Sequence, residues 1–229
     1  MDMSLKEETS RYHSQFYREN ELFSPGSWLE HSDPYLLETL IPELSNYESL
    51  RILDLGGGVG RNAIVLAKHL RNSHVDSVDV LPIASEKLLL YAAKHDVADR
   101  ISAITSDVSS FRIPSDHYDV ILAISVLEYC SSAEELAAKV SEIQCGTRPG
   151  GLNYLMIGGD IRERSIETGA VHTESRFSDG AQVRFLQPAY RDWKVSLAET
   201  RRYEEILVRN GIQIHWESDY VSWAAWKRA

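Results

Sequence analysis

A glycine-rich stretch at positions 54–60, Asp-Leu-Gly-Gly-Gly-Val-Gly, most constrains how this 229-residue chain can fold. The apolar run 51–55 before it predicts a short strand, and the apolar residues of 62–70 after it have helical spacing. Four glycines within five positions are unfavourable unless the backbone turns tightly or approaches a ligand closely. A helix that begins here also offers free N–H groups to a negatively charged ligand. We therefore expect a ligand-binding turn between strand and helix, with a ligand-free turn as the plain alternative.

The chain around this turn alternates between short apolar runs and helix signals. Further strands are expected at 75–80, 101–105, 118–125 and 152–157, and helices at 83–94 and 132–143. Ser132 and Glu135 have the spacing of a capping box at the start of the last of these helices. This alternation predicts an α/β protein with a parallel sheet.

The two ends of the chain add smaller elements. Ser32-Asp33-Pro34 reads as a helix start, because a capping side chain precedes a proline. Near the C-terminus we expect a helix at 200–209 that ends at Asn210-Gly211, then a hairpin of two short strands. The hairpin strands are expected at 212–216 and 221–226.

We interpret the chain as a single domain of ordinary size. Its four parts are an N-terminal helical cap (1–50), a ligand-binding core (51–157), a substrate lid (158–199) and a C-terminal helix with hairpin (200–229). The lid interpretation rests on length, since long segments without periodicity are often functional loops.

Three ligands compete for the glycine turn. A phosphate-binding P-loop needs Lys and Ser or Thr after its last glycine, but Arg61-Asn62 follows Gly60. A dinucleotide fingerprint needs a third glycine where Arg61 stands. The pattern Asp54-x-Gly56-x-Gly58-x-Gly60 instead resembles the first motif of class I S-adenosylmethionine (SAM)-dependent methyltransferases.

This resemblance covers most of 51–229 and implies a Rossmann-like fold. Such a fold has a seven-stranded, mostly parallel sheet, a reversed C-terminal hairpin and helices on both faces. Within the superfamily the chain most resembles tellurite-resistance-type and other small-molecule methyltransferases. That likeness rests on Gly60-Arg61-Asn62 and on Tyr190-Arg191-Asp192-Trp193.

The resemblance also implies which residues hold SAM. Asp79 lies about 20 residues past the glycines at a strand end, where a carboxylate can accept hydrogen bonds from both ribose hydroxyls. Asp107 would accept from the adenine amino group, although an Asp is also common as a turn residue. Tyr17 and His31 are placed near the cofactor. The expected cofactor residues are Asp54, Gly56, Gly57, Gly58, Asp79, Val80, Leu81, Asp107, Val108, Ile124, Ser125 and Tyr17.

Catalysis by such an enzyme is mainly in-line positioning of the acceptor, because the sulfonium is already a good leaving group. A general base helps when the acceptor is an alcohol, phenol or amine. His172 in the expected lid, and Glu128 and Tyr129 after the fourth strand, are weak candidates for catalytic residues. Arginines and aromatic residues of 158–199 could bind an anionic or planar acceptor. Cys130 and Cys145 match no zinc pattern, so no metal is expected.

Charge and an absent motif point to a small-molecule acceptor. The net charge of −10 argues against a nucleic-acid partner. The residues after the fourth strand, Ser125-Val126-Leu127-Glu128, lack the Asn/Asp-Pro-Pro-Tyr/Phe motif common in nucleobase and amide methyltransferases. The alternatives are a protein or RNA methyltransferase, a non-catalytic SAM-binding module and, disfavoured by the missing glycine, a nicotinamide-dependent oxidoreductase.

Location follows from what the sequence lacks. No apolar run approaches the roughly 20 residues of a membrane span, and positions 1–8 do not read as a signal peptide. We therefore expect a cytoplasmic protein with no membrane partner. The identity of the acceptor, the use of a general base, the closing of the lid and the oligomeric state are left open by the sequence.

Overall fold

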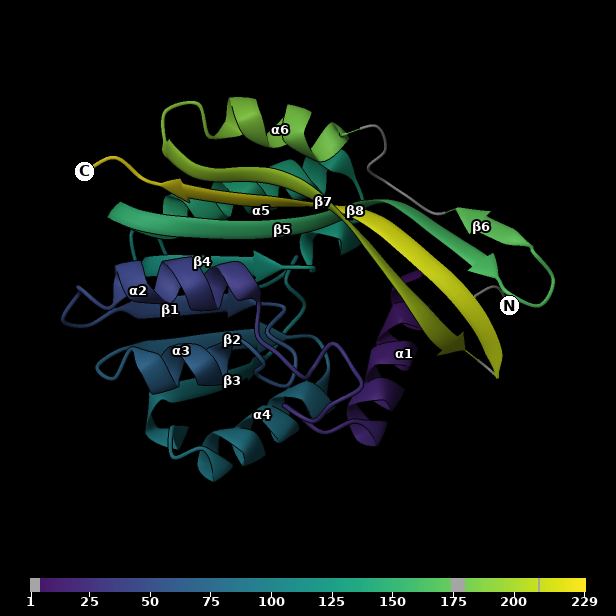
Figure 1. Cartoon of the computed structure of the whole chain (residues 1–229). Helices are drawn as coiled ribbons and strands as arrows, with labels where there is room; N and C mark the ends of the chain where they lie inside the picture. The colour runs from purple at the N-terminus through teal and green to yellow at the C-terminus, as the bar shows by residue number, and fades with distance from the viewer. Residues whose placement is uncertain (1–4, 174–179, 210) are drawn as a thin grey trace.

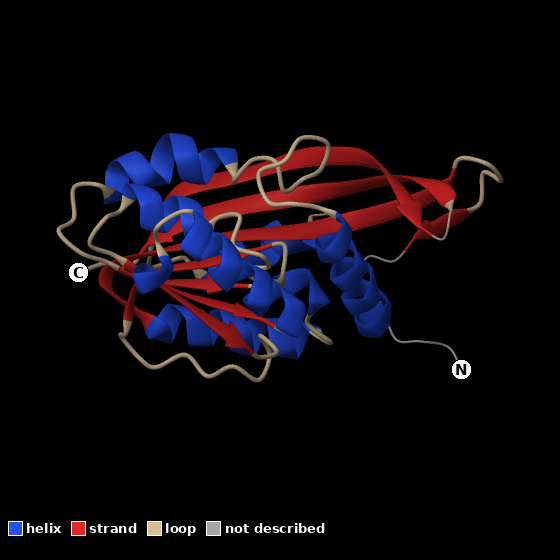
Figure 2. Ribbon diagram, turned by 90° about the horizontal axis from the view of Figure 1, so that it is seen from below, coloured by secondary structure: helices blue, strands red, loops and turns tan. Residues whose placement is uncertain are grey.

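One twisted sheet with helices on both faces forms the centre of the molecule in the computed structural model, which describes residues 5–173, 180–209 and 211–229 (Figure 1, Figure 2). The strand order is β3-β2-β1-β4-β5-β8-β7, and β6 pairs with β5 off this path. The strands from β3 to β5 are parallel, whereas β8 and β7 are antiparallel to their neighbours. The strands are β1 (Arg51–Leu55), β2 (His74–Asp79), β3 (Ile101–Thr105), β4 (Tyr118–Ile124), β5 (Thr147–Ser165), β6 (Val171–Thr173), β7 (Lys194–Arg209) and β8 (Ile212–Trp226).

The helices cover the sheet in two layers. They are α1 (Leu5–Glu19), the π-helical segment η1 (Leu36–Leu40), α2 (Ile41–Leu44), α3 (Ala63–His69), α4 (Pro82–Lys94), α5 (Ala133–Gly146) and α6 (Ala181–Ala189), with short 3-10 segments η2 (Ala98–Arg100) and η3 (Leu127–Tyr129). Alternate residues of each strand enter different cores. Ile52 of β1 packs with η1, α3 and α4, whereas Leu53 packs with α5 and α6. Among the described residues, no helix combines the length and apolarity that a membrane crossing requires.

The parallel half agrees with the sequence expectations. Each expected strand from 51 to 157 is present, and the main path of the sheet has seven strands with a reversed C-terminal hairpin, as the resemblance implied, plus one additional short strand, β6. The Ser132 side chain accepts a hydrogen bond from the Glu135 N–H at 3.1 Å and caps α5. Burial on both faces explains the continuous apolar sequence of β1 and β4.

The N-terminal segment is tied to this half by a buried polar network. Asp33 accepts from the Leu36 N–H at 3.0 Å, which confirms the helix start. The Tyr154 hydroxyl donates to the same Asp33 oxygen at 2.9 Å, and the Asp33 N–H donates to the Asn62 side chain at 3.1 Å. Asn62 precedes α3, so this segment is part of the core that supports the glycine turn.

The C-terminal half corrects three expectations. Residues 200–209 lie in strand β7 and form no helix, and β8 is one strand rather than two. The described residues of 158–199 form no long loop, since they contain the end of β5, then β6, α6 and the start of β7. The cause is tertiary: β7 pairs with β8 from Lys194–Trp226 to Arg209–Ile212, which overrides the weak helical spacing of the charged residues. Asn-Gly is also a typical hairpin turn.

The last three strands of the sheet path extend beyond the parallel core as an arm. Parallel pairing of β5 with β4 ends at Met156, opposite Ile124, and β5 then pairs only with β8 and β6. The register of β5 shifts between Gly159 and Arg162, which bends the strand where it leaves the core. We define the arm as residues 158–165, 201–209 and 212–220. Figure 1 shows that it projects beside α1.

Candidate active site

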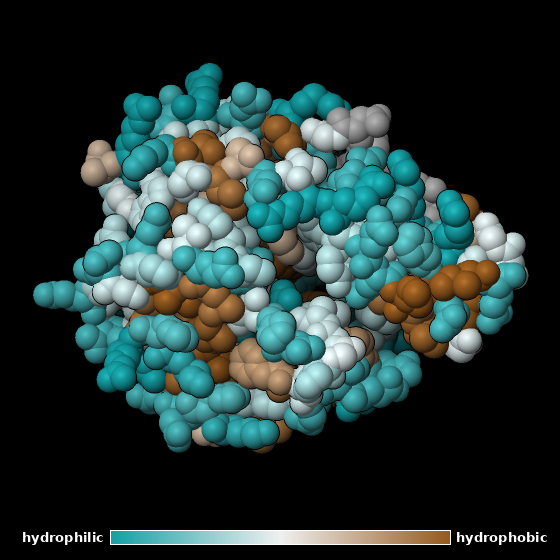
Figure 3. Space-filling view, in the orientation of Figure 1, coloured by the Kyte–Doolittle hydropathy of each residue, from teal (hydrophilic) through white to brown (hydrophobic). Residues whose placement is uncertain are grey.

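A single cavity of about 1610 Å³ runs from the glycine turn to the arm. It lies at the carboxyl ends of β1, β2 and β4, where ligands of open α/β sheets bind. A hollow opens near the centre of the face shown in Figure 3. All twelve residues expected to hold the cofactor line this cavity, and so do Glu128 and Tyr129.

The glycine turn is shaped by close packing inside the protein. A Cβ atom on Gly57 would lie 2.1 Å from the Ser77 hydroxyl oxygen, and one on Gly58 would lie 2.6 Å from the Tyr17 hydroxyl oxygen. Gly58 also has a φ of +55°, in the left-handed region. The N–H groups of Gly56 and Gly57 both donate to the Val78 carbonyl, at 2.7 and 3.1 Å. The turn is therefore fixed before any ligand enters.

Asp79, at the end of β2, is held by the turn that it faces. One carboxylate oxygen accepts from the Gly58 N–H at 3.0 Å, and the other accepts from the Leu81 N–H at 2.9 Å. Burial raises the pKa of Asp79, and these backbone N–H groups oppose the shift. Each oxygen keeps a second lone pair, so the carboxylate can still accept from a pair of vicinal hydroxyls.

Asp54 supplies a buried oxygen without a partner. Its side chain is almost fully buried, and its Oδ2 atom makes no hydrogen bond within the described structure. Burial raises the pKa of Asp54 to about 7, while Arg61 lowers it and Asp79 raises it further. A buried polar atom without a partner calls for a ligand group or water at this end of the cavity.

Asp107 has a structural partner already. Its Oδ1 atom accepts from both the N–H and the hydroxyl of Ser109, each at 2.9 Å, which is the geometry of a turn-stabilising aspartate. Asp107 nonetheless lines the cavity, as do the apolar side chains of Val80, Leu81 and Val108. Asp107 therefore stabilises the turn, and its ligand role stays a prediction that its place in the cavity lining allows.

Helix α1 and the segment after it cover the glycine turn. Tyr17 is buried, and burial raises its pKa, as does the nearby charge of Asp79, so its hydroxyl remains a hydrogen-bond donor. Phe16 stacks on Trp28 with ring centroids 5.1 Å apart, and the Arg61 guanidinium lies 5.3 Å from the Trp28 ring. The placement of His31 near the cofactor is wrong, since its side chain is 80% exposed and lies outside the cavity lining.

Glu128 is the most perturbed acidic group at the other end of the cavity. It follows β4, is only 7% exposed, and its Oε2 atom has no partner within the described structure. Burial raises the pKa of Glu128 to about 8, opposed by its own N–H and that of Gly158. Ser132, not Glu128, caps the next helix. Glu128 therefore lines the cavity and does not cap α5.

Ser125 and Tyr220 lie near Glu128 at this end of the cavity. Ser125 has a φ of +54°, and backbone strain of this kind in a residue other than glycine is common at functional sites. Tyr220 of β8 hydrogen-bonds the Ser125 side chain, and burial followed by the charge of Glu128 raises its pKa well above the usual value. The sequence analysis missed Tyr220 because it falls in the gap between the two short strands expected there. The aromatic alternation of β8 was the available signal.

Among the described residues, the other candidates for contact with the acceptor do not line this cavity. His172 lies on β6 opposite Glu163, and its side chain falls outside the described residues. Arg162 pairs with Glu217 at 3.5 Å and Arg191 with Asp192 at 3.3 Å, both away from the cavity. Arg176 lies outside the described residues. The described arginines of 158–199 therefore do not form the anion-binding surface that the sequence suggested.

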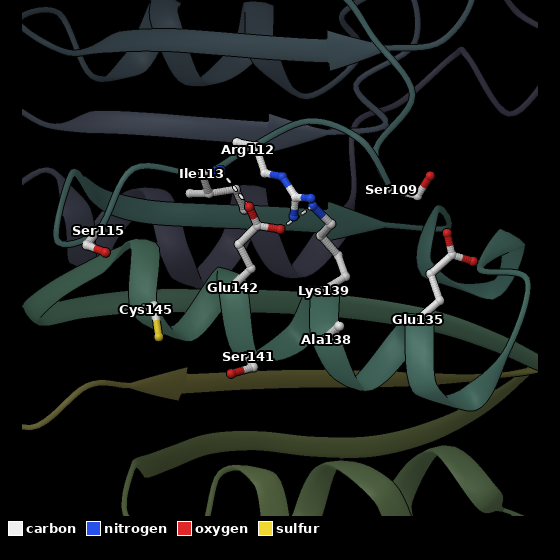
Figure 4. A pocket seen from close by; sticks show the side chains of 10 residues that line it. All are labelled: Ser109, Arg112, Ile113, Ser115, Glu135, Ala138, Lys139, Ser141, Glu142 and Cys145. Atoms are coloured by element: carbon white, nitrogen blue, oxygen red, sulfur yellow. Dashed lines mark hydrogen bonds and ion pairs between the residues drawn. The ribbon is translucent and has the colours of Figure 1, made fainter.

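A second, smaller hollow of about 350 Å³ lies along α5 (Figure 4). Its buried group is Lys139, which donates to the Phe111 carbonyl at 2.7 Å and pairs with Glu142. Glu142 in turn accepts from the Ile113 N–H at 2.9 Å. These groups satisfy one another, so we interpret this hollow as structural.

Comparison with known proteins agrees with this geometry. Residues 52–151 match the family model of a methyltransferase domain. The chain is 37% identical over 125 residues to the ribosomal protein L11 methyltransferase of Trichlorobacter lovleyi, which covers 55% of this chain and 37% of that protein. It is 28% identical over 111 residues to 2-methyl-6-phytyl-1,4-hydroquinone methyltransferase 1 of Oryza sativa subsp. japonica, which covers 48% of this chain and 31% of that protein. The chain thus spans about a third of the length of these two curated relatives.

Solved structures share the architecture. TehB from Haemophilus influenzae superposes with a TM-score of 0.60 at 19% sequence identity, covering 86% of this chain and 67% of that chain. At this identity the likeness concerns the fold. Residues 52–151 thus form a methyltransferase domain, and the fold is that of SAM-dependent methyltransferases, whose cofactor is S-adenosylmethionine.

Proposed function

We propose that the protein transfers the methyl group of SAM to a small-molecule acceptor, with both molecules bound in the one long cavity. The observation that carries the proposal is the continuity of this cavity. The residues suited to SAM line one end of it, and the buried carboxyl of Glu128 lies at the other, beyond the end of β4.

The residues present fit this cofactor. Asp79 offers two oxygens for the ribose hydroxyls, and Val80, Leu81 and Val108 offer apolar contact for the adenine, with Asp107 beside its amino group. The backbone of Ile124 and Ser125 suits the polar methionine part of SAM, and so does the Asp54 oxygen that has no hydrogen-bond partner in the described structure. Gly56, Gly57 and Gly58 allow close approach, and Tyr17 covers them. SAM supplies an electrophilic methyl carbon when bound.

Glu128 is the best candidate for a general base. An acceptor atom bound beside it would pass its proton to the Glu128 carboxylate and form the new bond to the methyl carbon. The carbon–sulfur bond would break with its electron pair retained by sulfur. The strained Ser125 backbone and the Tyr220 hydroxyl would position the acceptor, and α1 with the arm would exclude water.

Calorimetric titration with S-adenosylhomocysteine, and in parallel with NAD, tests the cofactor. We expect micromolar binding of S-adenosylhomocysteine, no binding of NAD, and a loss of affinity in Asp79→Ala. Binding of NAD alone, or an Asp79→Ala variant with unchanged affinity, would overturn the assignment. Single-turnover formation of S-adenosylhomocysteine with an acceptor then distinguishes an enzyme from a non-catalytic SAM-binding module.

The competing acceptor class is a protein, because one relative is named a ribosomal protein methyltransferase. The enclosed position of Glu128 and the net charge of −10 favour a small molecule and argue against nucleic acid. Incubation with radiolabelled SAM and a cell extract, followed by separation by size, decides between them. Label in the small-molecule fraction supports our proposal, and label only in protein or RNA contradicts it.

A further inference from the structure

An aromatic surface lines the cavity where the arm passes α1, and the sequence analysis assigned it no role. It consists of Tyr203 from β7 with Trp216 and Tyr220 from β8, which we call the aromatic triad. The ring centroids are 6.0 Å apart for Tyr203–Trp216, 6.4 Å for Tyr203–Tyr220 and 6.2 Å for Trp216–Tyr220. The planes are inclined to one another by 66°, 80° and 42°, so the rings do not stack flat.

Strand pairing explains why these rings share one face. Tyr203 lies opposite Ser218, which stands between Trp216 and Tyr220 along β8, and side chains alternate along a strand. Because the centroids form a nearly equilateral triangle, a group above its centre lies within about 6 Å of all three rings, the range of a cation–π contact. The triad is therefore suited to hold a compact cation.

Carboxylates surround the triad. Glu163 and Glu205 are the cross-strand neighbours of Trp216 on either side. The Tyr203 hydroxyl donates to Glu205 at 3.2 Å. Glu128, buried and with an oxygen lacking a partner, faces Tyr220 from the end of β4. This orphaned oxygen is independent of the ring geometry and indicates a polar ligand group at the same place.

The lining of the whole cavity, like the surroundings of the triad, is predominantly acidic. Its described lining holds ten Asp or Glu side chains but only four arginines, Arg11, Arg61, Arg201 and Arg202. Arg201, the cross-strand neighbour of Tyr220, is paired with Glu199 at 2.9 Å, and Arg202 is paired with Asp219 at 2.9 Å. An anionic acceptor would meet net repulsion here, whereas a cationic acceptor would be attracted.

Resting on the proposed function, we infer that the acceptor is an amine that enters as an ammonium ion, is held by the aromatic triad, and is methylated on nitrogen. When Glu128 is ionised, its carboxylate takes one proton from the ammonium, which becomes a neutral amine. Its lone pair forms the bond to the methyl carbon while the carbon–sulfur bond breaks toward sulfur. The products are an N-methylammonium ion and S-adenosylhomocysteine, and the proton on Glu128 returns to water.

A pair of probes of equal shape tests the binding step without turnover. Choline carries a quaternary nitrogen, and 3,3-dimethyl-1-butanol carries a carbon in its place. Calorimetry on the protein saturated with S-adenosylhomocysteine should show choline binding at least tenfold more tightly than the alcohol. Equal affinity for the two probes, or preference for the alcohol, would overturn the inference.

Matched tryptophan variants locate the site. Trp216→Leu should weaken choline binding at least tenfold, whereas Trp193→Leu, which changes a ring packed on Tyr190 outside the cavity, should leave it unchanged. Retained S-adenosylhomocysteine affinity in both variants shows that they fold. If S-adenosylhomocysteine binds and choline does not, the amine inference fails while the proposed function stands. If S-adenosylhomocysteine itself does not bind, the proposed function fails.

An acceptor screen supplies the second readout. Primary and secondary amines, phenols and carboxylic acids of similar size are incubated with the protein and SAM, and products are analysed by mass spectrometry. N-methylated products support the inference. Methylation confined to phenols or carboxylates would overturn it.

Discussion

The parallel half of the sheet and the arm build the two ends of one cavity by different means. In the parallel half, the candidate cofactor residues on the sheet lie at the end of a short buried strand or in the turn of a few residues that follows it. In the arm, Tyr203, Trp216 and Tyr220 come from strands of 16 and 15 residues whose pairing sets every side chain's direction. Local sequence therefore determines the proposed cofactor end, and long-range pairing determines the proposed acceptor end.

This difference explains which parts could be predicted from sequence. The glycine turn, Asp79 and the Ser132 cap each carry a short-range signal, and the structure has them where expected. The strand β7 carries a mixed signal in which charged residues suggest a helix. Only its partner β8 resolves that ambiguity, and a single sequence does not show this pairing. The aromatic triad was missed for the same reason.

The largest expected effect is a loss of stability from a substitution in the glycine turn at the cofactor end. Gly57→Ala places a Cβ 2.1 Å from the Ser77 hydroxyl oxygen. Overpacking of this kind costs on the order of 3 kcal/mol of unfolding free energy. Thermal and urea denaturation, together with calorimetry on S-adenosylhomocysteine, measure the loss. The double variant Gly57→Ala with Ser77→Ala should recover part of it, and a double variant no better than the single would contradict the packing argument.

The next effect depends on pH and concerns Glu128, at the end of the cavity away from the glycine turn. Burial raises the pKa of Glu128 from 4.5 to about 8, so the native state keeps a proton that the unfolded chain releases above pH 4.5. Stability conferred by this proton is complete below pH 4.5 and is lost as pH rises to about 8.

Glu128→Gln removes that titration. Urea denaturation at pH 5 and pH 8.5 should show the variant gaining stability over the parent protein as pH rises. Tyr220 faces the same carboxyl, and its raised pKa keeps it neutral across this range. A stability difference that is the same at both pH values would exclude the burial argument for Glu128.

A smaller effect separates two aspartates at the cofactor end. Asp79→Asn removes the charge from a carboxylate held by two N–H groups and should weaken S-adenosylhomocysteine binding by about 2 kcal/mol. Asp107→Asn should cost less, since one of its oxygens already serves the Ser109 turn. Calorimetry on both variants gives the comparison. Equal losses would mean that Asp107 is as important to the cofactor as Asp79.

The smallest expected effect comes from a substitution that compares the outer face of the arm with the face that carries the aromatic triad. Ile206 is 61% exposed and lines the cavity margin, but it lies on the face of β7 opposite to Tyr203, which is the outer face of the arm. Ile206→Thr should change unfolding free energy by no more than about 0.5 kcal/mol and leave choline binding unchanged. Denaturation and calorimetry check both values. A tenfold loss of choline affinity would show that the outer face of the arm also serves the acceptor.

The alternation of side chains along the arm has a consequence for how this protein, under the proposed function, can acquire new substrates. The backbone ladder of β7 and β8 holds whatever residue stands at 203, 205, 216 or 220, because the ladder uses only main-chain groups. Mutations at these positions alter the acceptor end without touching the glycine turn or Asp79. A combinatorial library confined to them would sample acceptor specificities on an intact cofactor site, and natural drift in the same positions would diversify substrates in the same way.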